Sequence, residues 1–391
     1  MLHKLLTVLI LTTLSFFFYF NTSLRDQGAR LFHLDRLEPA NSTLGFGAVI
    51  AVSKAGSARR EGLLFAANIT GIDIDIPNQP AWTEDDVEAF RSPQGSKIDR
   101  GSALAWMAHL NALRWFQSTN LSTALILEDD VDWSIHLRLS QIPLAARALR
   151  SLTSPDSITS IPEPSENSPN APQPPSLPTS SPTYWGDLTQ WELLHIGHCG
   201  DFFPAKRLPT LPHTIYEDAT VLPWGKLHHK TAEFLANMGL RQQERIVHKS
   251  RWPLCTFGYA VTQASAARLL AEHGTEGGPK GERGCVAFDV RTLEACRDKG
   301  WKCFSASPEL FHHITAPSMI KNVNEGVDDS GRLAGGKGPE DVQGTMNIYC
   351  GARSRDFFSR DNATVEYLRE VVGEKGVCLV DGMGDGEGRW P

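Results

Sequence analysis

The chain of 391 residues has few cysteines and no excess of basic residues, and each shortage excludes a class of protein. Seven cysteines without a CxxC pair are too few for a disulfide-rich scaffold and do not match a zinc ribbon. The formal net charge of −7 argues against a nucleic-acid partner, because a dedicated binder carries a basic face. The sequence also lacks internal repeats. With 41% hydrophobic and 21% charged residues, it is neither wholly disordered nor a polytopic membrane protein.

One long uncharged run lies at the N-terminus. Leu5–Phe20 contains sixteen residues without a charge, and a helix over residues 5–24 would be about 30 Å long, enough to cross a bilayer core. The run ends in bulky aromatic residues, so it fits an uncleaved signal anchor better than a cleaved signal peptide. A buried core helix is the remaining alternative. We expect residues 1–4 to be cytoplasmic, 5–24 to span the membrane and the rest to be lumenal, as in a single-pass type II protein.

Five glycosylation sequons agree with lumenal exposure; they begin at Asn21, Asn41, Asn68, Asn120 and Asn362. An oxidising lumen would allow disulfides, and an odd number of cysteines leaves at least one thiol unpaired within the chain. The pairing cannot be derived from the sequence.

Proline is concentrated in one segment. Nine of the 24 prolines lie in Ser151–Pro182 together with nine serines, a composition that cannot form a core. We therefore predict a stem over 25–44, one folded domain over 45–350 interrupted by a disordered insertion at 151–183, and a C-terminal extension over 351–391.

Strands and helices alternate through the folded part. Short apolar or alternating runs predict strands at Gly47–Ser53, Gly71–Ile76, Ala124–Leu127, Trp191–Ile196 and Gly258–Thr262. Helices are predicted at Ala58–Asn68, Gly101–Ser118, Ala264–Glu272 and Val290–Asp298. The alternation indicates an α/β sandwich with a mostly parallel central sheet. Ligands of such sheets bind beyond the carboxyl ends of the strands.

The most informative stretch is Ala124–Asp132 (ALILEDDVD), in which four apolar residues precede a run of carboxylates. Adjacent like charges resist desolvation, so they are seldom half-buried without a cation. Hard oxygen ligands suit Mn²⁺ or Mg²⁺. The candidate metal ligands are Glu128, Asp129, Asp130 and Asp132. The alternative is a solvated acidic turn with an aspartate as a helix N-cap.

The same stretch resembles the hallmark of glycosyltransferase family 25, which includes bacterial lipooligosaccharide galactosyltransferases and animal collagen galactosyltransferases. The order of the surrounding blocks over about Gly47–Ile320 is also similar; these blocks are SARREGL at 57–63, RG at 100–101 with His109, WELLHIGHCG at 191–200, GYA at 258–260 and VAFDV at 286–290. The chain departs from the family where Met-Ala-His replaces a Ser-His pair before the acidic strand. It also lacks the ER-retention tetrapeptide of the animal enzymes, so its anchor points towards the Golgi. The chain thus resembles an anchored eukaryotic member of the family.

The resemblance implies a GT-A-like, Rossmann-type fold that binds a UDP-sugar, with a glycan or glycoprotein as acceptor. A cation held by Asp130 would neutralise the diphosphate that leaves. The resemblance places Asp289 at the acceptor as a contact or general base; an ordinary helix N-cap is the alternative. The other candidate substrate-binding residues are Arg59, Arg60, Arg100, His109, His198 and Tyr259. For the arginines the alternative is a solvated helix face, and for His109 it is a core position.

The sequence leaves two further points open. His312 and His313 could close the site from its C-terminal side. A non-catalytic glycan-binding protein on a degenerate transferase fold and a metal-dependent phosphohydrolase are the alternatives to a glycosyltransferase.

Overall fold

The computed structural model describes residues 28–31, 37–154, 183–314, 319–324 and 345–380. The predicted cytoplasmic end (1–4), the anchor (5–24), almost all of the insertion and the last eleven residues of the extension lie outside these ranges. Within them, no helix is both long enough and apolar enough to cross a membrane.

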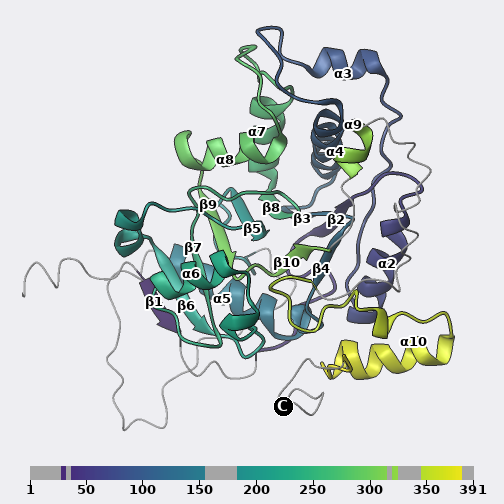
Figure 1. Cartoon of the computed structure of the whole chain (residues 1–391), viewed down its shortest axis with the longest axis vertical. Coiled ribbons are helices and arrows are strands. Elements are labelled where there is room, and N and C mark those ends of the chain that lie inside the picture. The colour runs from purple at the N-terminus through teal and green to yellow at the C-terminus, as the bar shows by residue number, and fades with distance from the viewer. Residues whose placement is uncertain (1–27, 32–36, 155–182, 315–318, 325–344, 381–391) are drawn as a thin grey trace, which may run out of the picture.

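A ten-stranded sheet forms the centre of the described fold (Figure 1). Its strands are β1 (Gly28–Leu31), β2 (Ala48–Val52), β3 (Thr123–Glu128), β4 (Val131–Trp133), β5 (Leu193–Gly197), β6 (His213–Glu217), β7 (Glu244–Lys249), β8 (Gly258–Thr262), β9 (Cys303–Ser307) and β10 (Phe311–His313). The main order is β1-β6-β7-β9-β5-β8-β3-β2, and β10 pairs with β4 and β5 beside this path.

The α/β class is confirmed, but the sheet is mixed rather than mostly parallel. β2 runs parallel to β3, and β5 runs parallel to β9. β8 lies between β3 and β5 and is antiparallel to both, and β7 is antiparallel to β6 and β9. The prediction of a mostly parallel sheet is therefore wrong, because a buried apolar run has the same composition in either strand direction.

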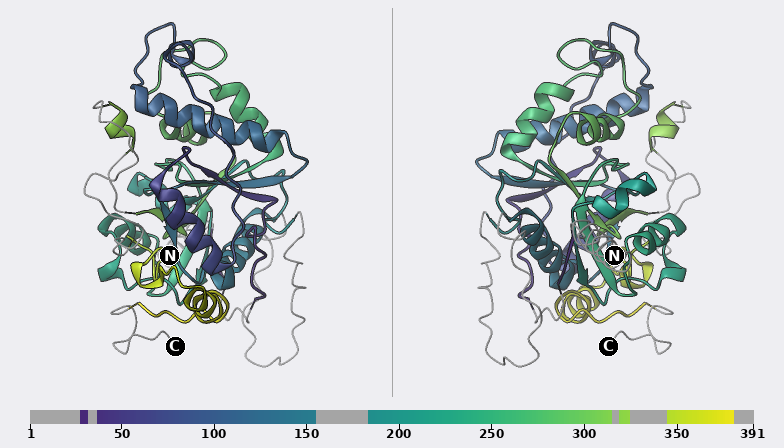
Figure 2. Two further views of the ribbon diagram at one scale, coloured as in Figure 1. Left: turned by 90° about the vertical axis from the view of Figure 1, so that its right-hand side faces the viewer. Right: turned by 90° about the vertical axis from the view of Figure 1, so that its left-hand side faces the viewer.

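Helices cover both faces of the sheet (Figure 2). They are α2 (Ala58–Thr70), α3 (Glu84–Phe90), α4 (Arg100–Gln117), α5 (Ile142–Thr153), α6 (His229–Asn237), α7 (Gln263–His273), α8 (Phe288–Asp298), α9 (Met319–Asn324) and α10 (Asn362–Leu368).

Side chains of a strand alternate between faces. On β3, Ala124 and Ile126 pack in the core under α4, whereas Leu125 and Leu127 pack in the core that includes α2 and α5.

Local chemistry sets the ends of the helices that carry the site. The Asp99 side chain accepts the amide of Ser102 at 2.7 Å and caps α4. α2 ends at Gly71, whose φ of +65° is in the left-handed region that favours glycine. The expected strand at Gly71–Ile76 is only an extended segment with one bridge, in which Asp75 pairs with Ile50 at the sheet edge.

The folded body extends beyond the predicted boundaries of residues 45 and 350. Within the predicted stem, Gly28–Leu31 forms β1, and Ala40 and Leu44 are buried in the core. α5 continues to Thr153, into the predicted insertion, and ends before Pro155, since the residue preceding a proline disfavours the helical conformation. The C-terminal residues up to 380 also pack on the body, and Phe357, Val372 and Cys378 are buried in its core.

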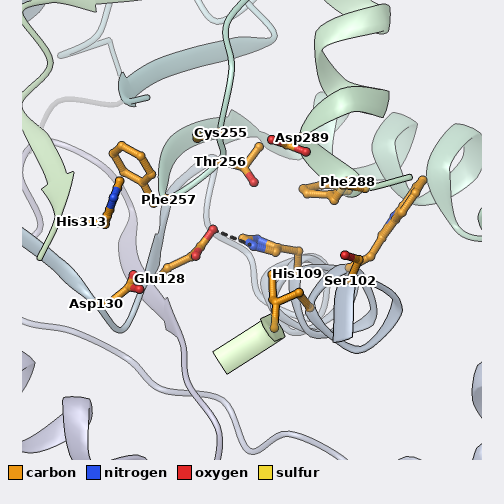
Figure 3. A pocket seen from close by; sticks show the side chains of 14 residues that line it. Ser102, His109, Glu128, Asp130, Cys255, Thr256, Phe257, Phe288, Asp289 and His313 are labelled. Carbon is orange, nitrogen blue, oxygen red and sulfur yellow. Dashed lines mark ion pairs between the residues drawn. The ribbon is translucent and has the colours of Figure 1, made fainter. Parts of the chain in front are cut away.

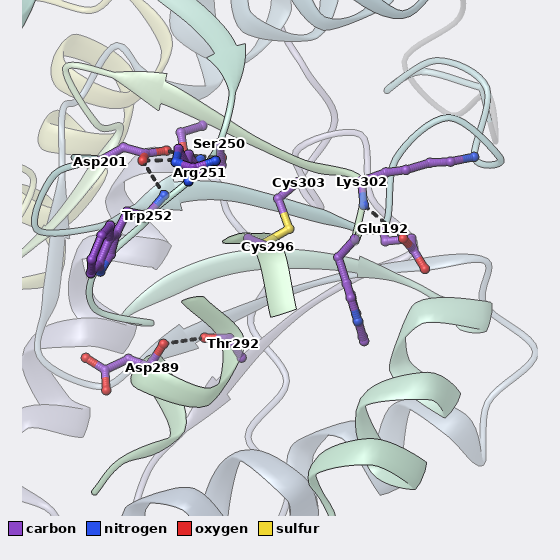
Figure 4. The surroundings of a disulfide bond; sticks show 12 residues. Glu192, Asp201, Ser250, Arg251, Trp252, Asp289, Thr292, Cys296, Lys302 and Cys303 are labelled. Carbon is purple, nitrogen blue, oxygen red and sulfur yellow. Dashed lines mark hydrogen bonds between the residues drawn. A yellow bond between two sulfur atoms is a disulfide. The ribbon is translucent and has the colours of Figure 1, made fainter. Parts of the chain in front are cut away.

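Three disulfides pair six of the seven cysteines, and Cys285 is buried and free. The expectation of at least one unpaired thiol is confirmed. The bonds are Cys199–Cys255, Cys296–Cys303 and Cys350–Cys378. The second bond ties the C-terminal end of α8 to β9 (Figure 4), so it anchors the helix whose first turn carries Asp289.

A buried ion pair joins β7 to the loop after β6. The Arg245 side chain is 2% exposed, and its Nε donates to Asp218 at 2.7 Å. We expect Arg245→Met to lower the free energy of unfolding by about 3–5 kcal/mol, because it leaves a buried carboxylate without its cation. Lys230→Met removes an exposed partner of Glu233 and should cost less than about 1 kcal/mol. Urea denaturation measures both, and equal effects would contradict this account.

Candidate functional site

A pocket of about 300 Å³ opens where β3 ends (Figure 3). Its polar lining includes Glu128 and Asp130 on one side and Asp289 on the other, together with His109 and His313. These residues come from β3 and the turn after it, the first turn of α8, α4 and β10. The fold thus brings together five of the residues singled out from the sequence.

The parallel pairing of β2 and β3 explains why the first strand–helix crossover meets the acidic turn. Val52 and Glu128 are register partners, so both strands end at the same edge. From the first turn of α2, the buried Arg59 donates through Nη1 to Asp130 Oδ2 at 2.9 Å. Nη1 is also 3.9 Å from Asp129 Oδ1. Arg59 therefore supplies positive charge inside the acidic turn.

Asp130 lies in an environment that disfavours its ionised form. Burial raises its pKa to about 7, and the neighbouring charges of Glu128 and Asp129 act in the same direction. Arg59 and Arg353 oppose this shift. Asp130 Oδ1 is buried and has no hydrogen-bond partner in the described part of the chain. The carboxylate thus has one buried acceptor that no described donor satisfies.

The other two predicted ligands do not line the pocket. Asp129 is buried and accepts a hydrogen bond from Ser53 Oγ at 2.7 Å. Asp132 is also buried and accepts from Thr345 Oγ1 at 2.7 Å and from the Arg353 amide at 2.9 Å. Burial raises the pKa of Asp132, and these donors oppose the shift. Protein donors therefore occupy the oxygens that the sequence suggested for a metal.

Behind Glu128, His109 and Tyr259 form a hydrogen-bonded pair. Tyr259 is fully buried, its hydroxyl is 3.2 Å from His109 Nδ1, and burial raises its pKa well above the usual range, so it keeps its proton. With Nδ1 accepting from this hydroxyl, a neutral His109 carries its proton on Nε2, 3.5 Å from Glu128 Oε1. His109 also stacks on Phe288 with ring centroids 5.0 Å apart. The pair orients Glu128, and only His109 reaches the pocket.

Asp289 lies within the first turn of α8, after Ala287 as the N-cap, so the N-cap alternative does not hold. Its Oδ1 accepts the Val290 amide at 2.8 Å. Burial raises the pKa of Asp289, and the charge of Glu128 adds to this, while the backbone of Cys255 stabilises the ionised form. The half-buried carboxylate across the pocket from Glu128 is therefore placed to accept a proton.

Of the six predicted substrate-binding residues, His109 lines the pocket, and the other five, Arg59, Arg60, Arg100, His198 and Tyr259, do not. Arg60 donates to Ser53 Oγ at 3.2 Å and to two carbonyl oxygens in the loop after β2. Arg100 is exposed and pairs with Glu84 at 2.7 Å, which agrees with the solvated alternative. His198 is buried; its Nε2 is 2.8 Å from the Ala306 carbonyl oxygen, and its Nδ1 accepts the Gly200 amide.

Sequence reasoning missed the residues that precede β8. Thr256 and Phe257 line the pocket, and the Phe257 carbonyl accepts the amide of Glu128 at 3.1 Å. Because β8 is antiparallel to β3, its beginning lies at the edge where β3 ends. A parallel sheet directs attention to the residues after β8 instead. Ser102, Trp106 and Phe288 also line the pocket, and only the position of Phe288 beside Asp289 could have indicated this.

The donor set fits a hard divalent cation through two residues. Glu128 and Asp130 line the pocket, Asp130 Oδ1 has no donor in the described part of the chain, and Mg²⁺ or Mn²⁺ commonly takes one or two carboxylates together with substrate phosphates. In the described ranges, no group of three or more His, Cys, Asp or Glu side chains is arranged to hold a metal ion. Any such cation would therefore depend on substrate oxygens for its remaining ligands.

Comparison with known proteins adds no family assignment: no protein-family model and no curated protein matches this chain.

Proposed function

We propose that the protein is a glycosyltransferase that transfers a hexose, galactose or glucose, from a UDP-sugar to a glycan or glycoprotein acceptor with a divalent cation, Mn²⁺ or Mg²⁺. The observation that carries this proposal is the convergence of Glu128, Asp130 and Asp289 on one pocket at the end of β3. The resemblance to glycosyltransferase family 25 places its acidic strand end and its late aspartate at these positions. A GT-A-like sheet is part of the same proposal, supported by the α/β layers and the parallel β2–β3 pair.

The charge of the pocket supports a cation requirement. Three carboxylates line it, and none of its lining residues is a lysine or arginine. A nucleoside diphosphate would be repelled by this surface. A divalent cation held by Glu128 and Asp130 would supply the positive charge that stabilises the leaving diphosphate.

The chain's own groups have distinct roles in this proposal. Asp289 takes the proton of the acceptor hydroxyl in an inverting transfer, since it is the carboxylate across the pocket from the acidic turn. His109 and Arg59 hold Glu128 and Asp130 in place. Trp106 and Phe288 are buried beneath the pocket and give its floor an apolar character.

Release of UDP tests the proposal. The purified chain, incubated with Mn²⁺ and a panel of UDP-sugars, should release UDP with at least one donor, and Asp130→Asn should lower the rate at least about 100-fold. Asp187→Asn, which alters an exposed acid outside the pocket, should leave the rate unchanged. Absence of release with every donor would refute the proposal. Phosphate release from simple phosphate esters would instead favour a phosphohydrolase.

One observation favours a second candidate, a glycan-binding protein on a degenerate transferase fold. Asp129 and Asp132 are satisfied by the protein itself, so only two of four acids remain for a metal. Glycan binding that is independent of metal and occurs without turnover would support this alternative.

We place the protein in a Golgi or other secretory-pathway membrane, with its folded body in the lumen. The N-terminal apolar run, the three disulfides and the exposed sequon residues Asn68, Asn120 and Asn362 support this location.

A further inference from the structure

The segment that follows residue 345 packs directly against the acidic turn and its strand. The Ala352 amide donates to the Trp133 carbonyl at 2.7 Å, and the Ile135 amide donates to the Cys350 carbonyl at 3.1 Å. Gly351 lies so close to Asp132 that a Cβ atom there would be 2.2 Å from Oδ2. The predicted C-terminal extension is thus part of the structure that supports the site.

Arg353 extends from this segment into the gap between the acidic turn and α2. The residue is 5% exposed. Its Nη1 donates to the carbonyl oxygens of Asp129 at 2.8 Å and Val131 at 3.0 Å, and its Nη2 donates to the Arg59 carbonyl at 3.1 Å. A single guanidinium group therefore joins the backbone on both sides of Asp130 to the backbone of Arg59, the residue that pairs with Asp130.

The surrounding chain leaves room for this side chain and holds its segment in place. A Cβ atom at Gly62, one turn after Arg59, would be 3.0 Å from Arg353 Nη2. The Cys350–Cys378 disulfide ties the segment to the end of the described chain. The helical turn Arg369–Glu374 that follows α10 packs on α2 (Figure 2). Its Gly373 lies against the Ile69 carbonyl.

We propose that Arg353 is a positioning residue of the site: its guanidinium group fixes the acidic turn relative to α2 and so directs Asp130 into the pocket. The fork of the guanidinium group matters as well as its charge, because three carbonyl oxygens on two elements are bonded at once. A lysine would retain the charge but could not reproduce this planar fork. The effect on turnover rests on the proposed function, whereas the positioning itself does not.

Arg353→Lys tests the proposal, and Arg138→Lys is its matched control. Arg138 also bonds to carbonyl oxygens, those of Thr70 at the end of α2 and of Ala40, but it contacts neither the acidic turn nor the pocket. Hydrogen exchange of the full chain is measured by mass spectrometry, together with the melting temperature. We expect Arg353→Lys to speed exchange about tenfold or more in peptides covering 128–135 and 57–63, while most other peptides exchange as in the wild type.

Steady-state UDP release gives the second measurement. If the wild type is active, Arg353→Lys should lower kcat about ten- to 100-fold, and Arg138→Lys should leave kcat within about twofold. The proposal fails if exchange at 128–135 is unchanged, if it rises evenly along the chain, or if an active enzyme keeps its kcat despite faster local exchange. A wild type that is inactive with every donor refutes the proposed function instead, and the exchange pattern then decides the role of Arg353.

Discussion

Replacing Asp289 with asparagine is expected to lower kcat by about 10²- to 10⁴-fold, with a much smaller change in KM. Asparagine has nearly the same shape and can still accept the Val290 amide, but it cannot take a proton from an acceptor hydroxyl. The half-buried position of Asp289, across the pocket from Glu128, gives this change its large effect. Steady-state kinetics of UDP release with saturating Mn²⁺ measure it.

Asp298→Asn is the matched control for this substitution. Asp298 is the last residue of the same helix, exposed and paired with Arg297, so its loss should leave kcat within about twofold. An Asp289→Asn variant that keeps its kcat within threefold would assign the proton acceptor to another group of the pocket. A variant that loses its melting transition would point to a structural role instead.

Acidification from pH 7 to pH 5 is expected to remove about 3 kcal/mol of stability, a large fraction of the stability of a typical domain. The cause is a set of buried neutral imidazoles. Burial lowers the pKa of His195, His248 and His273 to about 3 and that of His136 to about 4, from an ordinary value of 6.5.

The direction follows from proton binding in the two states. Below pH 6.5 the unfolded chain takes up protons that these folded histidines do not, so their contribution is complete above pH 6.5 and is lost as the pH falls towards 3–4. Between pH 7 and pH 5, protonation of these four histidines in the unfolded chain lowers the free energy of unfolding by about 8 kcal/mol in total. Asp130 and Asp201 act in the opposite sense: burial raises the pKa of each to about 7, so their protonation together returns about 4–6 kcal/mol over this range. The balance is a net loss of stability in acid.

Urea denaturation at several pH values tests the acid lability. His273→Phe offers a specific check, because His273 is fully buried, stacks on Trp301, and has no hydrogen bond to either ring nitrogen within the described structure. This variant should reduce the pH dependence of stability by about 1.4 kcal/mol per pH unit between pH 6 and pH 4. His229→Gln, which replaces an exposed histidine, should leave the pH dependence of stability unchanged. A wild-type stability that stays constant down to pH 5 would contradict the account.

The elements predicted from local patterns agree well with those observed, and the errors arise where direction or context decides. The apolar run before Glu128 and the periodicity of Gly101–Ser118 predicted β3 and α4 to within about one residue. Neither pattern indicates the direction of a strand. The sequence therefore could not predict that β8 lies between β3 and β5 and is antiparallel to both. Because of this error, the sequence did not identify Thr256 and Phe257, which line the pocket.

The sequence by itself identified a cluster of acids at the end of an apolar strand, a late aspartate and an odd number of cysteines. These are local facts of composition and order, and the structure brings Glu128, Asp130 and Asp289 to one pocket. Only the tertiary structure decided which carboxylates face the pocket and which are neutralised within the fold. Arg353, more than two hundred residues away from the acidic turn, contributes to that division: its guanidinium group bonds the carbonyl oxygens on both sides of Asp130, and its amide donates to Asp132. Long-range contacts of this kind leave no periodic or spacing signal in the chain, because the partners meet only when the C-terminal segment packs beside β4.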